Sequence, residues 1–135
     1  MKELTLEASL ESIPRVTAWI DEALEALDCP MKAQMQIDVA IDEIFGNIAH
    51  YAYPDGSGSA TVQLDYDAES RAVSITFLDR GIPFDPLARE DPDTTLGAAD
   101  REIGGLGIFL VKKTMDDVSY RYADGMNCLR LTKRL

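Results

Sequence analysis

The sequence predicts an α+β fold, a two-layer α/β sandwich in which helices pack on one face of a mixed, mostly antiparallel sheet. Three observations lead to this prediction: two segments with helical periodicity, two pairs of alternating segments that indicate hairpins, and a glycine-led apolar segment near the C-terminus. The order is strand, helix, helix, hairpin, long loop, helix, hairpin, which groups the helices against a sheet of neighbouring strands. A doubly wound dinucleotide fold is excluded, because no glycine turn separates the first strand from its helix.

The N-terminal half is expected to contain one strand and two helices. Leu4 and Leu6 alternate with polar neighbours and predict a short strand. Ser12 is the expected N-cap of a helix that ends at "DCP", and a second helix extends from after Pro30 to about Tyr51. The first helix has a single apolar face, made by Val16, Ile20, Leu24 and Leu27.

The C-terminal half is expected to contain two hairpins separated by a loop and a helix. Alternation over 60–66 and 72–78, joined by "DAES", predicts the first hairpin. Segments 118–123 and 127–132 predict a second hairpin across "DG". Between the hairpins, 80–103 has three prolines, many acids and no sustained period, and loops of that length are usually functional or mobile.

Composition narrows the classes of function. The chain has 135 residues, which suits a single domain spanning 1–135, and it shows neither a membrane-length apolar run nor a basic leader, so we expect a soluble cytoplasmic protein. The net charge of −11 argues against nucleic acid as a partner. Cys29 and Cys128 form no CxxC pair, and His50 is the sole histidine, which argues against a zinc site. A phosphate ligand would therefore need backbone amides and a bound cation.

The second helix carries a polar stripe beside its apolar one. Glu43, Asn47 and His50 follow one another at i, i+4 and i+7 in "DEIFGNIAHYAY". A carboxylate one turn before a carboxamide supplies a general base beside a neutral oxygen that can bind a hard cation such as Mg²⁺. The alternative is an ordinary amphipathic helix whose polar residues face water.

Two glycine-containing segments add to this signal. In "FLDRGIPFDP", Asp79 stands at the end of an apolar strand and Gly81 follows, so the carboxylate could accept from an amino group such as that of adenine. The alternative is a plain strand-to-loop exit. The stretch "GGLG", 104–107, precedes a helix without matching the P-loop or the dinucleotide pattern, yet amides there can converge on an anion. Each signal is weak alone, and their order along the chain strengthens them.

In this order the three segments resemble the motifs of the GHKL (Bergerat-fold) ATPases, and most closely those of the small bacterial anti-sigma factors that are also serine kinases. "DEIFGNIAHYAY" is similar to the N box, "DRGIPFDP" to the first glycine box and "GGLGIFLVKKTMDDVSY" to the second. The resemblance runs from Leu4 to Leu135 and implies a histidine-kinase-like ATPase fold that binds ATP and Mg²⁺.

The resemblance also implies a role for each matching residue. Glu43 would be the general base, Asn47 the Mg²⁺ ligand, and Asp79 the acceptor of the adenine amino group, with Gly81 allowing close approach. An ATP lid would extend from about Asp85 to Ile103. The phosphates would lie along Gly105, Leu106 and Gly107.

Three further features of the sequence bear on the resemblance. Arg15, in "SIPRVTAW", matches an arginine with which the sporulation kinase contacts its protein partners, although a solvated surface charge explains it equally well. The first glycine box has Ile82 and Pro83 after Gly81, where the family usually has a second glycine. The expected lid is acidic around "REDPD", and Arg101 is its nearest candidate cation.

The resemblance implies a Mg²⁺–ATP-dependent serine/threonine kinase that phosphorylates an anti-anti-sigma (STAS-type) partner and sequesters a sigma factor. Two alternatives stay open: a nucleotide-dependent protein-binding module without phosphoryl transfer, and a scaffold with a degenerate site. A sensor histidine kinase is disfavoured, because the only histidine lies inside the N-box helix, and length excludes the large topoisomerase, mismatch-repair and chaperone ATPases. A homodimer is left open, since close relatives pair.

Overall fold

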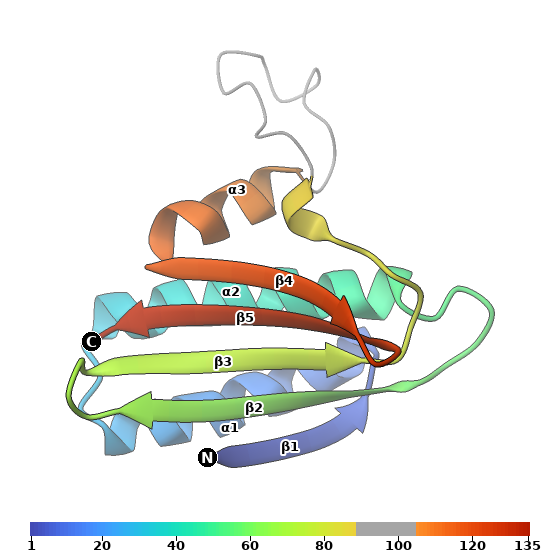
Figure 1. Ribbon diagram of the computed structural model, residues 1–135. Coiled ribbons are helices and arrows are strands. Elements are labelled where there is room, and N and C mark those ends of the chain that lie inside the picture. The colour runs from blue at the N-terminus through green and yellow to red at the C-terminus, as the bar shows by residue number, and fades with distance from the viewer. Residues whose placement is uncertain (89–104) are drawn as a thin grey trace.

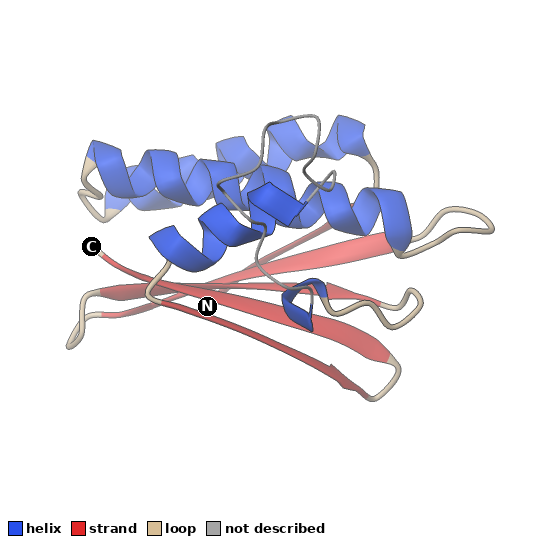
Figure 2. Ribbon diagram, turned by 90° about the horizontal axis from the view of Figure 1, so that it is seen from above, coloured by secondary structure: helices blue, strands red, loops and turns tan. Residues whose placement is uncertain are grey.

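The chain folds into a layer of helices packed on a layer of strands. The computed structural model describes residues 1–88 and 105–135. Figure 2 shows the α-helices together on one side of the strands. Figure 1 labels the main elements, which follow in the order β1 (Lys2–Glu7), η1 (Leu10–Ser12), α1 (Ile13–Ala26), α2 (Met31–Tyr51), β2 (Ser59–Asp67), β3 (Ala72–Asp79), η2 (Pro86–Ala88), α3 (Gly105–Thr114), β4 (Asp117–Ala123) and β5 (Met126–Arg134).

The sheet has five strands in the order β1-β2-β3-β5-β4 among the described residues. Each pairing there is antiparallel, where the sequence predicts a mixed, mostly antiparallel sheet. Because β5 lies between β3 and β4, the C-terminal hairpin adds to the sheet through its second strand (Figure 1). This order places Asn127 of β5 directly opposite Asp79 of β3.

The "DG" sequence forms the tight turn that it predicts. Ala123 pairs with Met126, so the hairpin loop consists of two residues. Asp124 and Gly125 have φ values of 55° and 75°. Positive φ at both central residues is what a type I′ turn requires, and its twist matches that of the two strands. The C-terminal hairpin therefore closes at the expected position.

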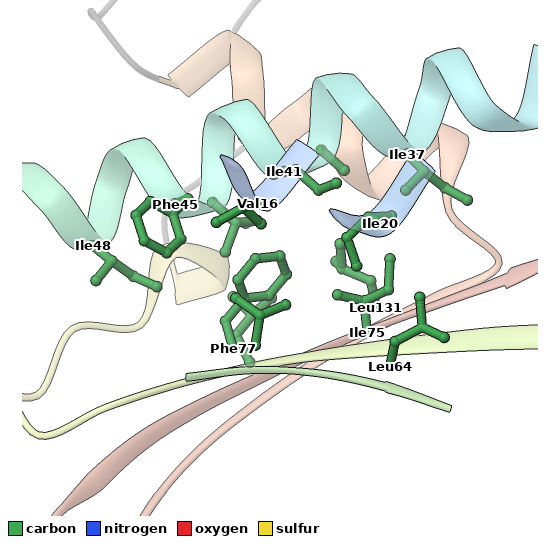
Figure 3. Packing of buried hydrophobic residues seen from close by; sticks show 14 of the residues in the cluster. Val16, Ile20, Ile37, Ile41, Phe45, Ile48, Leu64, Ile75, Phe77 and Leu131 are labelled. Atoms are coloured by element: carbon green, nitrogen blue, oxygen red, sulfur yellow. The ribbon is translucent and has the colours of Figure 1, made fainter. Parts of the chain in front are cut away.

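The hydrophobic core lies between the sheet and the apolar faces of α1 and α2. Alternate residues of the central strands point toward the helices, as a period of two requires. Figure 3 shows these side chains meeting those of α2 and α1. The largest fully buried members are Val16, Ile20, Leu24, Ile37, Ile41, Phe45, Val62, Val73, Ile75, Phe77, Val111 and Leu131. The apolar face predicted for the first helix is thus buried at Val16, Ile20 and Leu24.

The two ends of α1 differ in how well the sequence predicts them. At the C-terminal end Asp28 adopts φ 56°, and the N–H groups of Asp28 and Cys29 donate to the carbonyl oxygens of Glu25 and Leu24. This is a Schellman motif, which explains why the helix ends at "DCP". At the N-terminal end Ser12 is the N-cap residue, but its side chain makes no capping hydrogen bond. Its backbone is already helical because η1 leads directly into α1, so the hydroxyl lacks the extended geometry that capping needs.

The segment after β3 is described as far as Ala88. It contacts the end of α2 through the Ile82 N–H, which donates to the Ala52 carbonyl oxygen, and it forms the short turn η2. The remainder of the expected lid, 89–103 with Arg101, lies outside the described residues. No helix within 1–88 or 105–135 is long and apolar enough to cross a bilayer.

Candidate functional site

A cavity lies where the C-terminal half of α2 covers the end of β3. It encloses about 390 Å³ of space not filled by atoms, part of it open to solvent. Small-molecule sites are mostly apolar with a few placed polar groups. The lining comes from α2, β3, the loop after β3, and the C-terminal hairpin, and comprises Ile44, Asn47, Ile48, Ala52, Phe77, Asp79, Ile82, Phe84, Pro86, Tyr120, Asn127 and Leu129. An apolar lining with so few polar groups suits a ligand such as a heteroaromatic ring, which is largely apolar and carries a few hydrogen-bonding groups.

Asp79 is the buried carboxylate of this cavity. It ends β3, and only 6% of its surface is exposed. Its Oδ1 accepts hydrogen bonds from the backbone N–H of Gly81 and from Nδ2 of Asn127, both at 2.9 Å. Two donors on one oxygen fix the plane of the carboxylate. The group is therefore oriented to accept a hydrogen bond from an amino group within the cavity, as the sequence predicts for adenine.

Gly81 lies against the backbone at the end of α2. The N–H of Ile82 donates to the carbonyl oxygen of Ala52 at 2.9 Å. A Cβ on Gly81 would overlap that same carbonyl oxygen. The sequence interpretation gives Gly81 the role of admitting a ring at close range. The structure adds a second reason for glycine, which is close contact between this loop and α2.

Glu43 and Asn47 lie one turn apart on the same face of α2, and both are half-buried. Asn47 lines the cavity together with Asp79. Burial raises the pKa of the Glu43 carboxyl, and the neighbouring carboxylate of Asp42 raises it further. A carboxyl whose pKa is shifted toward neutral pH is suited to general base catalysis.

The first turn of α3 lies over Glu43. A Cβ on Gly107 would overlap the Glu43 carboxylate, so the glycine leaves room for this side chain. Gly105 and Leu106 belong to the same first turn. The free N–H groups and the dipole at the start of a helix attract anions. The beginning of α3 and the face of α2 that carries Glu43 thus meet.

The donor set fits Mg²⁺ held mainly by a nucleotide. The described residues contain no cluster of three or more His, Cys, Asp or Glu side chains that could hold a metal by themselves. Mg²⁺ is usually bound through one or two protein oxygens together with phosphates and water. The Asn47 carboxamide beside the Glu43 carboxyl matches that pattern. Within 1–88 and 105–135, no Lys or Arg lines the cavity, so this part of the chain would supply positive field through helix amides and the cation.

Arg15 lies apart from these groups. It is exposed in the first turn of α1 and does not line the cavity. The structure therefore brings together Glu43, Asn47, Asp79, Gly81 and the start of α3, and leaves Arg15 on a separate surface.

The sequence interpretation gives no role to Asn127, Tyr120 or Phe84, which line the cavity. Asn127 is a buried polar residue that hydrogen-bonds Asp79. Tyr120 lines the cavity beside it and donates to its Oδ1. Phe84 also lines the cavity, and its ring stacks on that of Tyr51 with centroids 5.1 Å apart. One signal in the sequence could have identified Asn127. It shares the period-two pattern of Leu129 and Leu131, so it is a polar residue at a position of the strand that faces the core.

Comparisons with known proteins agree with this arrangement. The family model described as "Histidine kinase-like ATPase domain" matches residues 6–133. The chain belongs to the histidine kinase-like ATPase family. This confirms the GHKL fold and the resemblance to the small bacterial anti-sigma factor and serine-protein kinase branch.

Curated relatives match at low identity. The serine/threonine-protein kinase BtrW of Bordetella bronchiseptica is 28% identical over 95% of this chain and 91% of its own length. The serine-protein kinase RsbW of Halalkalibacterium halodurans is 27% identical over 98% of this chain and 82% of its own length. RsbW of Listeria monocytogenes is 27% identical over 67% of this chain and 60% of its own length. The chain is thus similar to proteins named as kinases along most of its sequence.

Proposed function

We propose that the chain is a Mg²⁺–ATP-dependent protein serine/threonine kinase. Its substrate would be an anti-anti-sigma (STAS-type) protein, and it would also sequester a sigma factor. The observation that carries the nucleotide part is the apolar cavity with the buried carboxylate of Asp79, adjoining Asn47. The kinase part is supported by the names of BtrW and RsbW and by the carboxyl of Glu43 beneath the first turn of α3.

Each side chain then has a distinct role in binding. Asp79 accepts a hydrogen bond from the adenine amino group, and Gly81 keeps the loop close to both the ring and α2. Asn47 would hold Mg²⁺, which when bound would supply positive charge beside the phosphates. The amides of Gly105, Leu106 and Gly107 face the phosphates, where the helix dipole favours negative charge.

Glu43 is proposed as the general base of the transfer. The serine hydroxyl gives its proton to the Glu43 carboxylate while its oxygen bonds to the γ-phosphorus, and the bond to the β–γ bridging oxygen breaks to release ADP. The raised pKa of Glu43 makes the carboxylate a better proton acceptor at neutral pH. The transfer requires the ionised carboxylate. As the pH falls, activity should therefore decline at a pH above the pKa of an ordinary glutamate side chain.

Partner binding is proposed for the surface around Arg15. An exposed guanidinium can form bidentate hydrogen bonds with a carboxylate or a phosphoserine of a partner. We further propose that 1–135 forms a single domain, that the protein acts in the cytoplasm, and that it can pair as a homodimer.

The first prediction tests the catalytic base. Glu43→Gln should reduce phosphoryl transfer to a purified STAS-type partner by about 100-fold or more, since the amide accepts no proton. Its affinity for ATP should stay within a few-fold of the wild type. Transfer is measured with radiolabelled ATP and affinity by calorimetry, with Glu22→Gln on the exposed side of α1 as the control. Transfer by Glu43→Gln at the wild-type rate would remove this assignment.

A further inference from the structure

Asn127 is one of the two polar side chains that the described part of the chain buries almost completely. It is 6% exposed and lies on β5 opposite Asp79. Its Nδ2 donates to Oδ1 of Asp79 at 2.9 Å and to the carbonyl oxygen of Ile82 at 2.8 Å. Its Oδ1 accepts from the N–H of Phe84 at 3.1 Å and from the hydroxyl of Tyr120. Every donor and acceptor site of this amide is thus used.

These bonds give the amide one orientation. Its oxygen faces two donors, the Phe84 N–H and the Tyr120 O–H, and its nitrogen faces two acceptors. A flipped amide would place an NH₂ group against an N–H and an oxygen against a carboxylate. Asn127 consequently presents a donor to Asp79.

The same amide forms hydrogen bonds to the loop on both sides of Pro83. It bonds to the carbonyl of Ile82 on one side of the proline and to the N–H of Phe84 on the other. Proline has no N–H of its own to anchor the loop, and its ring restricts the preceding residue. Here the side chain of Asn127 forms the hydrogen bonds to the Ile82 carbonyl and the Phe84 N–H that a neighbouring strand would otherwise form. This is the segment in which Ile82 and Pro83 follow Gly81 without the second glycine of the related motif.

We propose that Asn127 is the positioning residue of the adenine pocket, which orients the Asp79 carboxylate and clamps the loop 82–84 against the cavity. The inference rests on the proposed nucleotide function for its ligand, whereas the clamp itself is a property of the protein without nucleotide. Asn127 would let this chain form the pocket with Ile82 and Pro83 in the first glycine box.

The first test replaces the donor by an acceptor. In Asn127→Asp two carboxyl groups face each other at hydrogen-bond distance, where they hold one proton between them only at lower pH. ATP affinity by calorimetry should therefore fall by about tenfold or more at pH 8 and recover partly at pH 5, because a charged hydrogen bond is lost and then restored. The wild type and Thr132→Ala, also on β5, should show no such recovery. Wild-type affinity of Asn127→Asp at both pH values would overturn the proposal.

The second test measures the hydrogen bond between Asn127 and the Phe84 N–H in the protein without nucleotide. Amide hydrogen exchange of Phe84, followed by NMR, should be slow in the wild type and at least tenfold faster in Asn127→Ala. The Ile82 amide donates to Ala52 instead and should stay protected, which separates loss of the clamp from unfolding. Unchanged exchange at Phe84 would overturn the clamp. If the wild type binds no ATP, the proposed function fails, and the Phe84 result still decides the clamp.

Discussion

At the scale of single residues, the glycines near the site differ in what a side chain would meet. A Cβ on Gly81 would meet the backbone carbonyl of Ala52, which has no freedom to move. A Cβ on Gly107 would meet the far end of the Glu43 side chain, which can rotate away. A Cβ on Gly46 would meet nothing within 4 Å. The three positions should therefore respond differently to alanine.

Gly81→Ala and Gly46→Ala should shift stability in opposite directions. Gly81→Ala forces the loop away from α2 and should destabilise the protein by about 1–3 kcal/mol, as overpacking typically does. Gly46→Ala lies inside α2 and should stabilise it by roughly 0.5–1 kcal/mol, because glycine is a poor helix former. Urea unfolding without nucleotide measures both. A stable Gly81→Ala protein would show that the contact with Ala52 is not needed.

Gly107→Ala should separate catalysis from stability. The added methyl group displaces the Glu43 carboxylate, so phosphoryl transfer should fall by about tenfold or more. The melting temperature should stay the same or rise slightly, since alanine favours α3. Steady-state transfer and thermal unfolding are measured on the same preparation. Full activity would show that Glu43 does not act from its present position.

The local part of the site can be predicted from the sequence, and the non-local part cannot. Helix spacing places Glu43 and Asn47 on one face. A strand end followed by glycine makes Asp79 a candidate, and the resemblance to the GHKL motifs then selects it. Asn127 contacts Asp79 across two neighbouring strands, and the two residues are 48 positions apart in the chain. That contact depends on strand order, which residue patterns alone do not determine.

At the scale of elements, two carboxyl groups meet between α1 and α2. The Oδ1 atoms of Asp21 and Asp38 are buried and have no hydrogen-bond partner among the described residues. Burial, a hydrogen bond to Asp21 and the Asp21 charge raise the pKa of Asp38 from 3.8 to about 7. The pair of carboxyl groups therefore retains a proton to a higher pH than a single exposed aspartate would. Burial, followed by the charges of both aspartates, also raises the pKa of the nearby Cys29 thiol, while Lys133 lowers it.

Stability should depend on pH through this pair. In the folded protein Asp38 stays protonated to about pH 7, whereas in the unfolded chain it ionises near its ordinary value of 3.8. The folded state thus binds the proton more tightly, and the stability that this contributes is lost as pH rises from about 4 to about 7. Asp38→Asn should flatten that decline in urea unfolding curves, and Glu22→Gln should not. An unchanged slope in Asp38→Asn would contradict the shared proton.

The elements themselves follow closely from sequence because their signals are local. The periodicity of α2 and the "DG" turn predict a helix and a hairpin at nearly the observed bounds. The Ser12 side-chain cap is absent, since η1 already gives its backbone helical angles. The turn η2 is not predicted, because a single turn leaves no periodic signal.

At the scale of the whole molecule, one topological choice builds the site. The C-terminal hairpin could join the sheet through either of its strands, and the sequence pattern of both strands alternates in the same way. In the structure β5 pairs with β3, which brings Asn127 to Asp79 and Tyr120 to the cavity. With a net charge of −11, we expect nucleotide phosphates to bind together with a cation.

Calorimetric titration with ATP, with and without Mg²⁺, tests the central claim most directly. We expect Mg²⁺-dependent ATP binding by the wild type, weakened about tenfold or more in Asp79→Asn and in Asn47→Ala, because each removes a partner of the nucleotide or its metal. Asp65→Asn, on the exposed part of β2, should bind like the wild type. Absence of ATP binding by the folded wild-type protein would contradict the nucleotide site, and with it the kinase.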